Sequence, residues 1–195
     1  MVFNTFARMN DKIILGIDPG SNVTGYGILK IGNPELILLS AGVFDNSGED
    51  DHFIKLRSIF NSVLNLIDEY HPDELAIEEP FYGKNVQSML KLGRAQGVAI
   101  AAALYRNLSV TGYSPRKIKQ SITGNGSASK EQVAAMLQRI LSFNNAVHFL
   151  DATDALAVAV CHHFQNGKIT SGKKSYSGWK SFLQDNPGRV KQMPG

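Results

Sequence analysis

The chain of 195 residues contains a single cysteine, Cys161, and this scarcity excludes several kinds of protein. One cysteine cannot close a disulfide within the chain, and it cannot alone build a thiolate metal site. Because Cys161 falls in a predicted helix, we expect it to be a small buried apolar side chain. A disulfide-stapled fold is therefore not expected.

Long hydrophobic runs are also missing. The longest strongly apolar stretch without a charged residue is Ala95–Tyr105, which is much shorter than the roughly 20 residues of a membrane-spanning helix. Residues 1–11 lack the continuous apolar core and cleavage site of a secretory signal. We predict a cytoplasmic protein with no membrane partner.

Acidic residues are absent from a long central segment, Pro80–Lys130, which holds eight basic residues. Such a segment is typical of a surface that binds a phosphate-rich partner. An ordinary solvated surface, whose counter-charges come from elsewhere in the fold, would have the same composition. Residues 166–195 hold six basic residues and one acidic residue, so the formal net charge of +3 resides there.

The length predicts one domain, or one domain and a tail. We divide the chain into an N-terminal extension (1–12), one folded domain (13–165) and a basic tail (166–195) that is rich in Gly, Ser, Lys and Pro and that we expect to be mobile.

Apolar periodicity predicts the secondary structure. The predicted strands are Ile13–Ile17, Tyr26–Ile31, Leu36–Phe44, Leu75–Ile77 and Leu108–Tyr113. The predicted helices are Phe53 to about His71, Asn85–Asn107, a short basic helix from Ser114, a helix to Leu141 capped by Ser127 or Ser129, and Asp151–Phe164. We therefore predict an α/β fold, in which a mixed sheet has three antiparallel strands followed by parallel strands and is covered by helices on both faces.

Acidic side chains follow two of the predicted strands at the point where each strand ends. Asp18 follows the first strand and Glu78 the fourth, so parallel neighbours would bring both acids to one edge of the sheet. Asp151 and Asp154 lie three residues apart on a predicted helix and share one face of it. Four carboxylates converging in this way would suit Mg²⁺ or Mn²⁺.

Each acid also has a purely structural interpretation. Asp151 and Asp154 are residue types favoured at the start of a helix, and Asp18 before Pro-Gly is typical of a turn. Side chains alternate along a strand, so only one of Glu78 and Glu79 can face the other acids. Periodicity alone does not say which one.

The segment Ile14–Ser21, continuing through Thr24–Gly27, resembles the opening signature of the RuvC family, the bacterial Holliday junction resolvases (crossover junction endodeoxyribonucleases). Later segments resemble the same family in order: Ala76–Glu78 with Phe81 and Lys84–Asn85, Leu90–Gly93 to Gly97–Ala99, Ile118–Gln120 with Gly124 and Gly126, and Asp151–Ala157. The likeness covers residues 13–163. It implies a ribonuclease H-like nuclease domain that resolves four-way DNA junctions as a homodimer, by symmetric metal-dependent phosphodiester hydrolysis in recombination and repair.

Carried over position by position, the resemblance assigns the catalytic, metal-binding acids to Asp18, Glu78, Asp151 and Asp154, and so favours Glu78 over Glu79. It implies two Mg²⁺ ions in each active site, for which Mn²⁺ would substitute. Lys119 and Lys130 match basic residues that assist catalysis at the phosphate.

The same resemblance extends to the DNA. Phe81 matches an aromatic residue that acts on bases near the junction centre, although a loop Phe also commonly folds back over a strand end. The remaining expected DNA-binding residues are Lys84, Asn85, Lys91, Arg94, Arg116 and Lys117. The chain departs from the family pattern at Glu79, where an amide is usual, and at the following Pro80. RuvA and RuvB, the branch-migration proteins, are the partners that the family implies.

Two features leave alternatives open. The small residues of Asn85–Asn107 would suit a dimer contact or close packing against the protein's own sheet. Gly16–Ser21 with Thr24–Gly25 also resembles the phosphate-binding hairpin of the actin and sugar-kinase superfamily, but those enzymes need two such domains and this chain is too short. A ribonuclease H-like RNA-processing or non-catalytic nucleic-acid-binding relative is the alternative function, and the intact set of four acids weakens it.

Overall fold

The computed structural model describes residues 11–32, 35–80, 85–141 and 152–170, with side chains described as far as residue 166. Three of the predicted site residues, Phe81, Lys84 and Asp151, lie outside these ranges, as do most of the expected extension and tail. The chain divides into two compact units, residues 1–165 and 166–195.

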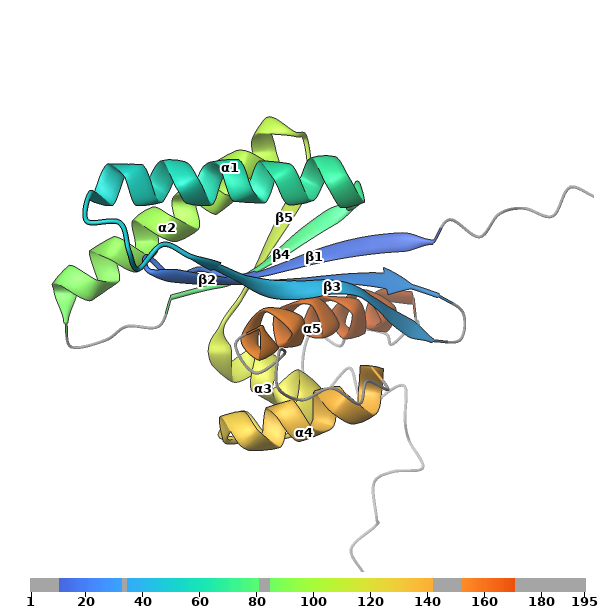
Figure 1. The fold of residues 1–195 in the computed structure, drawn as a ribbon. Helices are drawn as coiled ribbons and strands as arrows, with labels where there is room; N and C mark the ends of the chain where they lie inside the picture. Colours follow the sequence, from blue (N-terminus) through green and yellow to red (C-terminus); the bar gives the residue numbers. More distant parts are fainter. Residues whose placement is uncertain (1–10, 33–34, 81–84, 142–151, 171–195) are drawn as a thin grey trace, which may run out of the picture. The chain divides into compact units, whose positions relative to one another are not determined.

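Five strands and five helices form within the described residues (Figure 1). The strands are β1 (Lys12–Asp18), β2 (Val23–Ile31), β3 (Leu36–Asp45), β4 (Glu74–Glu78) and β5 (Ser109–Tyr113). The helices are α1 (His52–Tyr70), α2 (Val86–Tyr105), α3 (Pro115–Thr123), α4 (Lys130–Leu141) and α5 (Thr153–Thr170).

The strands form one sheet in the order β3-β2-β1-β4-β5. β1 pairs antiparallel with β2, and β2 with β3, whereas β1–β4 and β4–β5 are parallel pairs. The predicted mixed sheet is therefore confirmed. Short apolar runs that end in Gly, Pro or acidic residues predicted the central strands, because a strand that is buried on both faces is apolar at consecutive positions.

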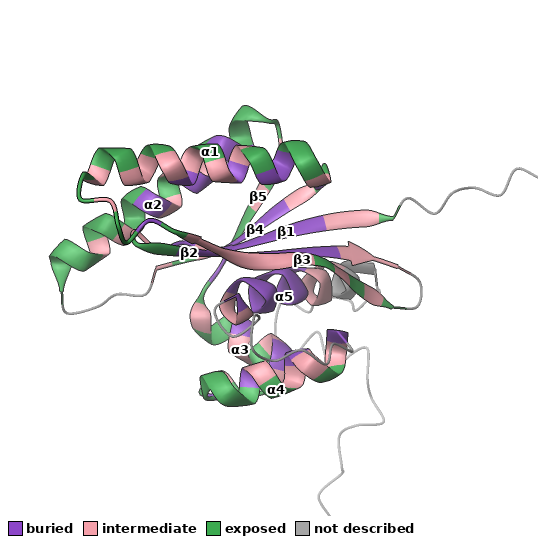
Figure 2. Ribbon diagram, viewed as in Figure 1, coloured by how far each residue is buried: buried purple, intermediate pink, exposed green. Residues whose placement is uncertain are grey.

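Helices cover both faces of the sheet (Figures 1 and 2). Leu15, Ile17 and Ile77 pack on one face against α1 and α2, and we call this the α1/α2 face. Ile14 and Ala76 point to the other side, where they pack against α3, α4 and α5; this is the α5 face. Each face has its own apolar core, since successive side chains of a strand point in opposite directions.

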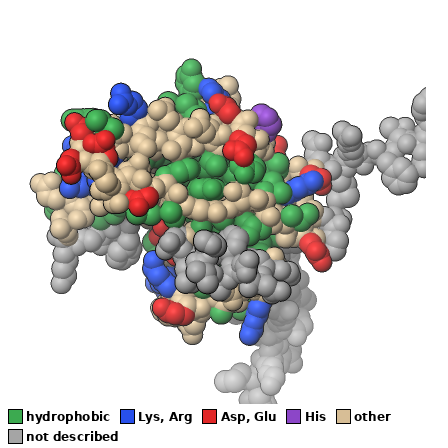
Figure 3. All heavy atoms as spheres, in the orientation of Figure 1, with side chains coloured by type: hydrophobic (Ala, Val, Ile, Leu, Met, Phe, Trp, Pro, Cys, Tyr) green, Lys and Arg blue, Asp and Glu red, His purple; other side chains and the backbone are tan. Residues whose placement is uncertain are grey.

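The outer strand β3 is covered less completely. Ile37 is 47% exposed and Leu39 40% exposed, and apolar side chains are visible along this edge of the sheet in Figure 3. Phe44 of β3 instead stacks on Tyr26 of β2, with ring centroids 5.0 Å apart. The buried part of the sheet is therefore centred on β1 and β4.

Two glycines form the surface on which α5 lies. Gly16 of β1 and Gly27 of β2 are direct partners in the antiparallel pair. A Cβ atom at Gly16 would collide with the carbonyl oxygen of Ala155 and lie 2.8 Å from Cβ of Ala159, and one at Gly27 would lie 2.6 Å from Cδ2 of Leu156. The helix therefore packs directly on the strand backbone, which only glycine allows.

The limits of α5 differ from the prediction. The helix begins at Thr153 rather than Asp151, which lies outside the described residues, and it continues past Phe164 to Thr170. Polar composition suggested a tail from residue 166, but no proline interrupts residues 165–170, so the helical hydrogen bonds continue. Cys161 is fully buried on this helix, as predicted. Among the described helices, none combines the length and apolar character needed to cross a bilayer.

Candidate active site

Asp18 and Glu78 lie at the carboxyl ends of adjacent parallel strands. The last paired residues are Ile17 of β1 and Ile77 of β4, and the two acids follow them directly. Asp18 continues the α5-facing series of Ile14 and Gly16, and Glu78 lies on the same side as Ala76 because side chains alternate. Both carboxylates therefore belong to the α5 face.

Asp154 reaches the same place from the first turn of α5. The neighbouring Ala155 lies against Gly16, only two residues before Asp18, so the close packing of the helix on β1 brings the acids together. The Oδ2 atom of Asp154 accepts a hydrogen bond from Nζ of Lys130 at 2.6 Å. The carboxylate is therefore held between the strand end and the start of α4.

A reciprocal pair of hydrogen bonds sets the start of α4. The backbone N–H of Ser129 donates to Oε1 of Gln132 at 2.9 Å, and the N–H of Gln132 donates to the Ser129 hydroxyl at 3.4 Å. This is a capping box. It places Lys130 at the first residue of the helix, facing Asp154.

Predicted catalytic residues from four elements line one pocket. Glu78, Lys119, Lys130 and Asp154 surround it, and Ile118, Val133 and Ala157 are among its apolar neighbours. Of the six predicted catalytic residues, only Asp18, which acts on this group electrostatically, and Asp151, which is not described, are missing from the lining. The structure therefore brings two acids and two lysines together in a pocket that apolar side chains also line.

Burial and like charge both act on Glu78. Desolvation by burial, followed by the negative charges of Asp18 and Asp154, raises the pKa of Glu78 to about 8, although Lys130 and Lys119 oppose the shift. A buried carboxylate beside others favours the protonated form. Without a bound cation, the surroundings of this side chain therefore favour its protonated form.

Asp18 has the same kind of environment. Burial raises its pKa to about 6, the charge of Asp154 adds to the shift, and Lys130 lowers it. The hydrogen bond to Asp154 in turn raises the pKa of Lys130, against a smaller effect of burial. The site thus places three carboxyl groups beside two lysines, and the raised pKa values of Asp18 and Glu78 reflect the cost of charging all three at once.

This crowding of carboxyl groups fits a divalent cation. Carboxylate oxygens are the ligands that Mg²⁺ and Mn²⁺ prefer, and a bound cation would relieve the repulsion between Asp18, Glu78 and Asp154. Within the described ranges, no three His, Cys, Asp or Glu side chains already form a coordinating group. The chemistry of the donors fits the metal, and Asp151 is not described.

Glu79 lies apart from the pocket. It is exposed, and its backbone N–H donates to the carbonyl of Tyr113 at 2.9 Å. Its side chain covers β5, where a Cβ atom at Gly112 would lie 3.0 Å from Cγ of Glu79. The structure thus separates Glu78 from Glu79, as alternation along the strand requires.

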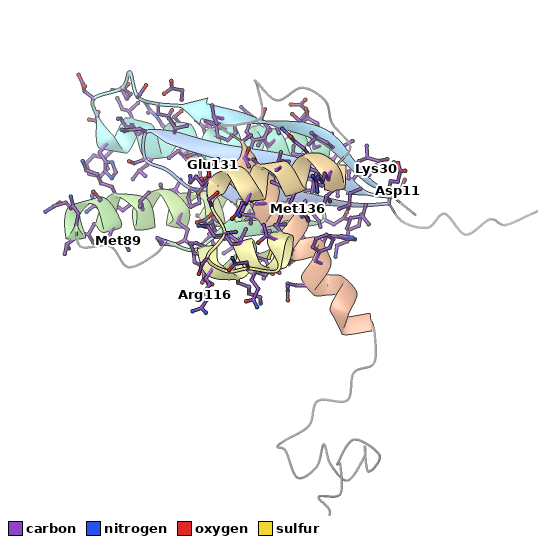
Figure 4. The ribbon with its side chains drawn as sticks, turned by 90° about the horizontal axis from the view of Figure 1, so that it is seen from below. Asp11, Lys30, Met89, Arg116, Glu131 and Met136 are labelled. Atoms are coloured by element: carbon purple, nitrogen blue, oxygen red, sulfur yellow. The ribbon has the colours of Figure 1, made fainter. Side chains whose placement is uncertain are left out.

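The predicted DNA-binding residues fall into separate groups. Arg116 and Lys117 are exposed on α3, where Arg116 projects outward (Figure 4) and Nζ of Lys117 lies 5.2 Å from the ring centroid of Tyr113. Lys91 and Arg94 are exposed on α2, across the sheet from the pocket.

Two other polar residues of the basic segment have structural roles. Asn85 caps α2, because its side chain accepts a hydrogen bond from the N–H of Ser88. Arg106 makes two hydrogen bonds of 2.7 Å to Asp68, so its counter-charge does come from elsewhere in the fold. The segment without acids is therefore not one continuous basic surface.

A chain of polar contacts that the sequence did not predict joins β5, α5, β4 and β1. The hydroxyl of Tyr113 lies 2.8 Å from Nδ1 of His162, Nε2 of His162 lies 2.6 Å from Glu74, and Glu74 pairs with Lys12 at 2.6 Å. Burial raises the pKa of Tyr113 to about 12. His162 follows Asp154 by two helical turns, so these contacts fix the rotation of α5 about its axis. The signal was His162, the first polar residue after the apolar run Ala155–Cys161.

Comparisons with known proteins cover nearly the whole chain. The model of the family described as crossover junction endodeoxyribonuclease RuvC matches residues 14–162. Proteins of that name from Cytophaga hutchinsonii and Bacteroides fragilis are 57% and 56% identical, over 100% and 94% of this chain and 96% and 98% of theirs. The solved structure of T. thermophilus RuvC in complex with Holliday junction substrate aligns with a TM-score of 0.76 and 31% identity, covering 82% of this chain and 97% of that one.

Proposed function

Since the chain belongs to the RuvC family of crossover junction endodeoxyribonucleases, we propose that this nuclease resolves four-way DNA (Holliday) junctions in recombination and repair. The observation that carries the proposal is the convergence of Asp18, Glu78 and Asp154 with two lysines at the carboxyl edge of the central strands. An RNA-processing or non-catalytic role is not favoured, because the matched relatives carry the nuclease name and this chain keeps all four acids.

We assign the metal site to the same acids. Asp18, Glu78 and Asp154, with Asp151 as the fourth ligand, would hold two Mg²⁺ ions, and Mn²⁺ would substitute. When bound, the ions would activate a water molecule and stabilise the leaving oxygen. The raised pKa of Glu78 means that this carboxyl group must release a proton before it serves as a ligand.

The two lysines would bind the phosphate. Lys130 already shares its ammonium group with Asp154, and Lys119 is close enough to Glu78 to lower its pKa. Both ammonium groups line the pocket that holds the acids, so an incoming phosphate would meet positive charge beside the carboxylates. Ile118, Val133 and Ala157 would exclude bulk water and so strengthen these interactions.

A homodimer would supply two such sites. The exposed side of α2 carries Val86, Leu90 and Leu104, which are 68%, 53% and 57% exposed. Between them, Gly93 and Gly97 have open space where a Cβ atom would stand, so another backbone can approach closely. We assign this apolar stripe to contact with a second copy of the chain, since a two-fold axis suits symmetric cleavage of a four-way junction.

The remaining assignments concern the DNA and other proteins. Phe81, which follows β4 outside the described residues, would stack on bases near the junction centre. Lys84, Lys91, Arg94, Arg116 and Lys117 would contact the backbone of the arms, with Asn85 beside them. RuvA and RuvB, the branch-migration proteins, are the proposed protein partners.

A side-by-side cleavage assay tests the proposal. Four-way, duplex and single-stranded DNA, together with a structured RNA, are incubated with the full-length protein and Mg²⁺. We expect paired symmetric nicks in the four-way junction alone, and none when EDTA replaces Mg²⁺. Preferential cutting of RNA, or junction binding without any cleavage, would overturn the proposal in favour of the alternative.

A further inference from the structure

A second polar pocket lies on the α1/α2 face of the sheet. Its polar lining comes from four places in the chain: the turn between β1 and β2 (Ser21 and Asn22), the loop before α1 (Asp50), α1 (His52 and Lys55) and α2 (Ser88 and Lys91). The turn begins directly after the strand end that carries Asp18. The pocket therefore borders the same edge of the sheet as the active site, but from the opposite face.

Two ammonium groups dominate the charge of this pocket. Nζ of Lys55 donates to Oδ1 of Asn22 at 2.8 Å, which holds it over the turn. Lys91 is exposed on α2 and makes no ion pair with any described residue. Asp50, which is exposed, is the only acid among the lining residues. Asp45, outside the lining, has a pKa that is lowered mainly by hydrogen bonds and to a smaller extent by the charge of Lys55, so it lies near that lysine. Among the lining residues themselves, positive charge is in excess.

His52 adds an unused hydrogen-bonding group. Its Nε2 atom is buried and has no hydrogen-bond partner among the described residues. A neutral imidazole protonated at this nitrogen is a donor. Buried polar groups in proteins are rarely left without a partner, so a rotation of the ring that brings this nitrogen to the pocket would let a ligand oxygen pair with it.

The helix ends themselves do not explain the pocket. The carboxylate of Asp51 already accepts the N–H groups of Phe53 and Ile54 at the start of α1. Asn85 accepts the N–H of Ser88 at the start of α2. These backbone donors are taken, so an anion here would be held by side chains.

We propose that this pocket binds a backbone phosphate of the junction DNA, at a position separate from the phosphate that is cleaved. The inference rests on the proposed function. Lys119 and Lys130 stand on the α5 face of the strand ends, and Lys55 and Lys91 stand on the other face. A strand crossing the edge of the sheet would therefore meet a pair of lysines on each side of the carboxylates.

Salt titration of junction binding tests the inference. Dissociation constants of the full-length protein, Lys55→Gln and Lys91→Gln are measured in EDTA over a series of salt concentrations. Each variant should bind more weakly, and the slope of log affinity against log salt should become shallower by about 0.9 for each lost phosphate contact. Lys55→Arg should keep the wild-type slope because it keeps the charge.

Arg57→Gln is the matched control. Arg57 is an exposed cation two residues further along α1, and it is not part of the pocket lining. Two residues turn a helix by about 200°, so this variant should keep the wild-type slope. If Lys55→Gln and Lys91→Gln behave like Arg57→Gln while the wild type still cuts junctions, the inference fails and the proposed function stands.

Two further measurements separate the other outcomes. A wild type that neither binds nor cuts four-way junctions contradicts the proposed function itself. If inorganic phosphate at matched ionic strength shifts the His52 ring signals in a Lys55-dependent way, with unchanged junction slopes, the pocket binds free phosphate and the inference is wrong. If Lys55→Gln fails to fold, the exposed Lys91→Gln carries the test.

Discussion

The two faces of the sheet use small residues in opposite ways. On the α5 face, Gly16 and Gly27 lie under a helix at positions where a Cβ atom would collide with it. On the α1/α2 face, α2 packs against the core through buried alanines such as Ala95 and Ala99. The glycines of α2 have open space where a Cβ atom would stand. Glycine therefore brings two parts of one chain together on the first face, and leaves room for something outside the chain on the second.

The electrostatics of the faces differ in the same sense. The α5 face concentrates carboxylates whose mutual repulsion and burial raise the pKa of Asp18 and Glu78. The α1/α2 face has a pocket in which Lys55 and Lys91 outnumber the single acid. In these proposals, chemistry on a phosphate is accordingly assigned to the α5 face, and contact with nucleic acid and with a second copy of the chain to the α1/α2 face.

The largest expected effect comes from neutralising an acid of the α5 face. Glu78→Gln and Asp154→Asn should each reduce junction cleavage by more than about 100-fold, which is the upper range for losing a residue that only hydrogen-bonds to a metal ligand. Junction binding in EDTA should remain close to that of the wild type. Glu79→Gln, which changes an exposed acid beside the site, is the control and should retain most of the activity. Equal losses for Glu78→Gln and Glu79→Gln would contradict the comparison.

The next largest effect concerns the exposed stripe of α2. Leu90→Glu should weaken dimerisation by about 2 kcal/mol or more, as expected of a central interface residue, which is roughly a 30-fold change. Sedimentation equilibrium measures it. Phe53→Glu is the control, because Phe53 is 77% exposed on α1 and lies outside the stripe. A dimer that resists Leu90→Glu would assign the interface elsewhere.

A pair of Gly→Ala substitutions tests the comparison directly. Gly16→Ala should destabilise the fold by about 1 to 3 kcal/mol, because the added methyl overpacks α5. Gly97→Ala should stabilise the folded monomer by about 0.5 to 1 kcal/mol, since alanine is the better helix former. Thermal unfolding at a concentration that keeps the protein monomeric measures both changes. Shifts of the same sign would show that the two faces do not differ as described.

The smallest expected effect is the loss of a helix cap. Ser129→Ala should cost about 1 kcal/mol, or roughly 2 to 4 °C in Tm for a chain of this size. Asp51→Ala, which removes the cap of α1, should cost a similar amount. Cleavage per folded molecule should fall for Ser129→Ala alone, because only that cap positions Lys130 beside Asp154. A parallel fall for Asp51→Ala would argue against this distinction.

The topology and the strand-end acids were predictable because they depend on local patterns. An apolar run followed by an acid and a breaker identifies a central strand, and Asp18 and Glu78 are part of that pattern. The choice between Glu78 and Glu79 depends on which face α5 covers, and the periodicity of one strand does not contain that information. The structure supplies it through the packing of α5 on Gly16.

Other features required contacts between distant segments. Lys55 was not in the predicted basic segment, and only the fold brings it beside Lys91. Arg106 was counted in that segment, but it pairs with Asp68. The buried chain through His162 joins strands and a helix that are 49 and 88 residues apart in sequence. Counting charges along the sequence therefore overestimated the basic surface of Pro80–Lys130 and did not find the pocket that Lys55 and Lys91 share.

Direct packing of α5 on the backbone at Gly16 has a consequence for how precisely the active site is positioned. Catalytic groups must be held to within about 0.5 Å of their productive geometry. A side chain between helix and strand would change rotamer, and each rotamer would set a different spacing. Peptide groups in contact have no such freedom, because their bond lengths and planarity are fixed. The spacing between the backbones that carry Asp154 and Asp18 is thus set by covalent geometry and atomic radii, so it should vary little as the surrounding side chains fluctuate.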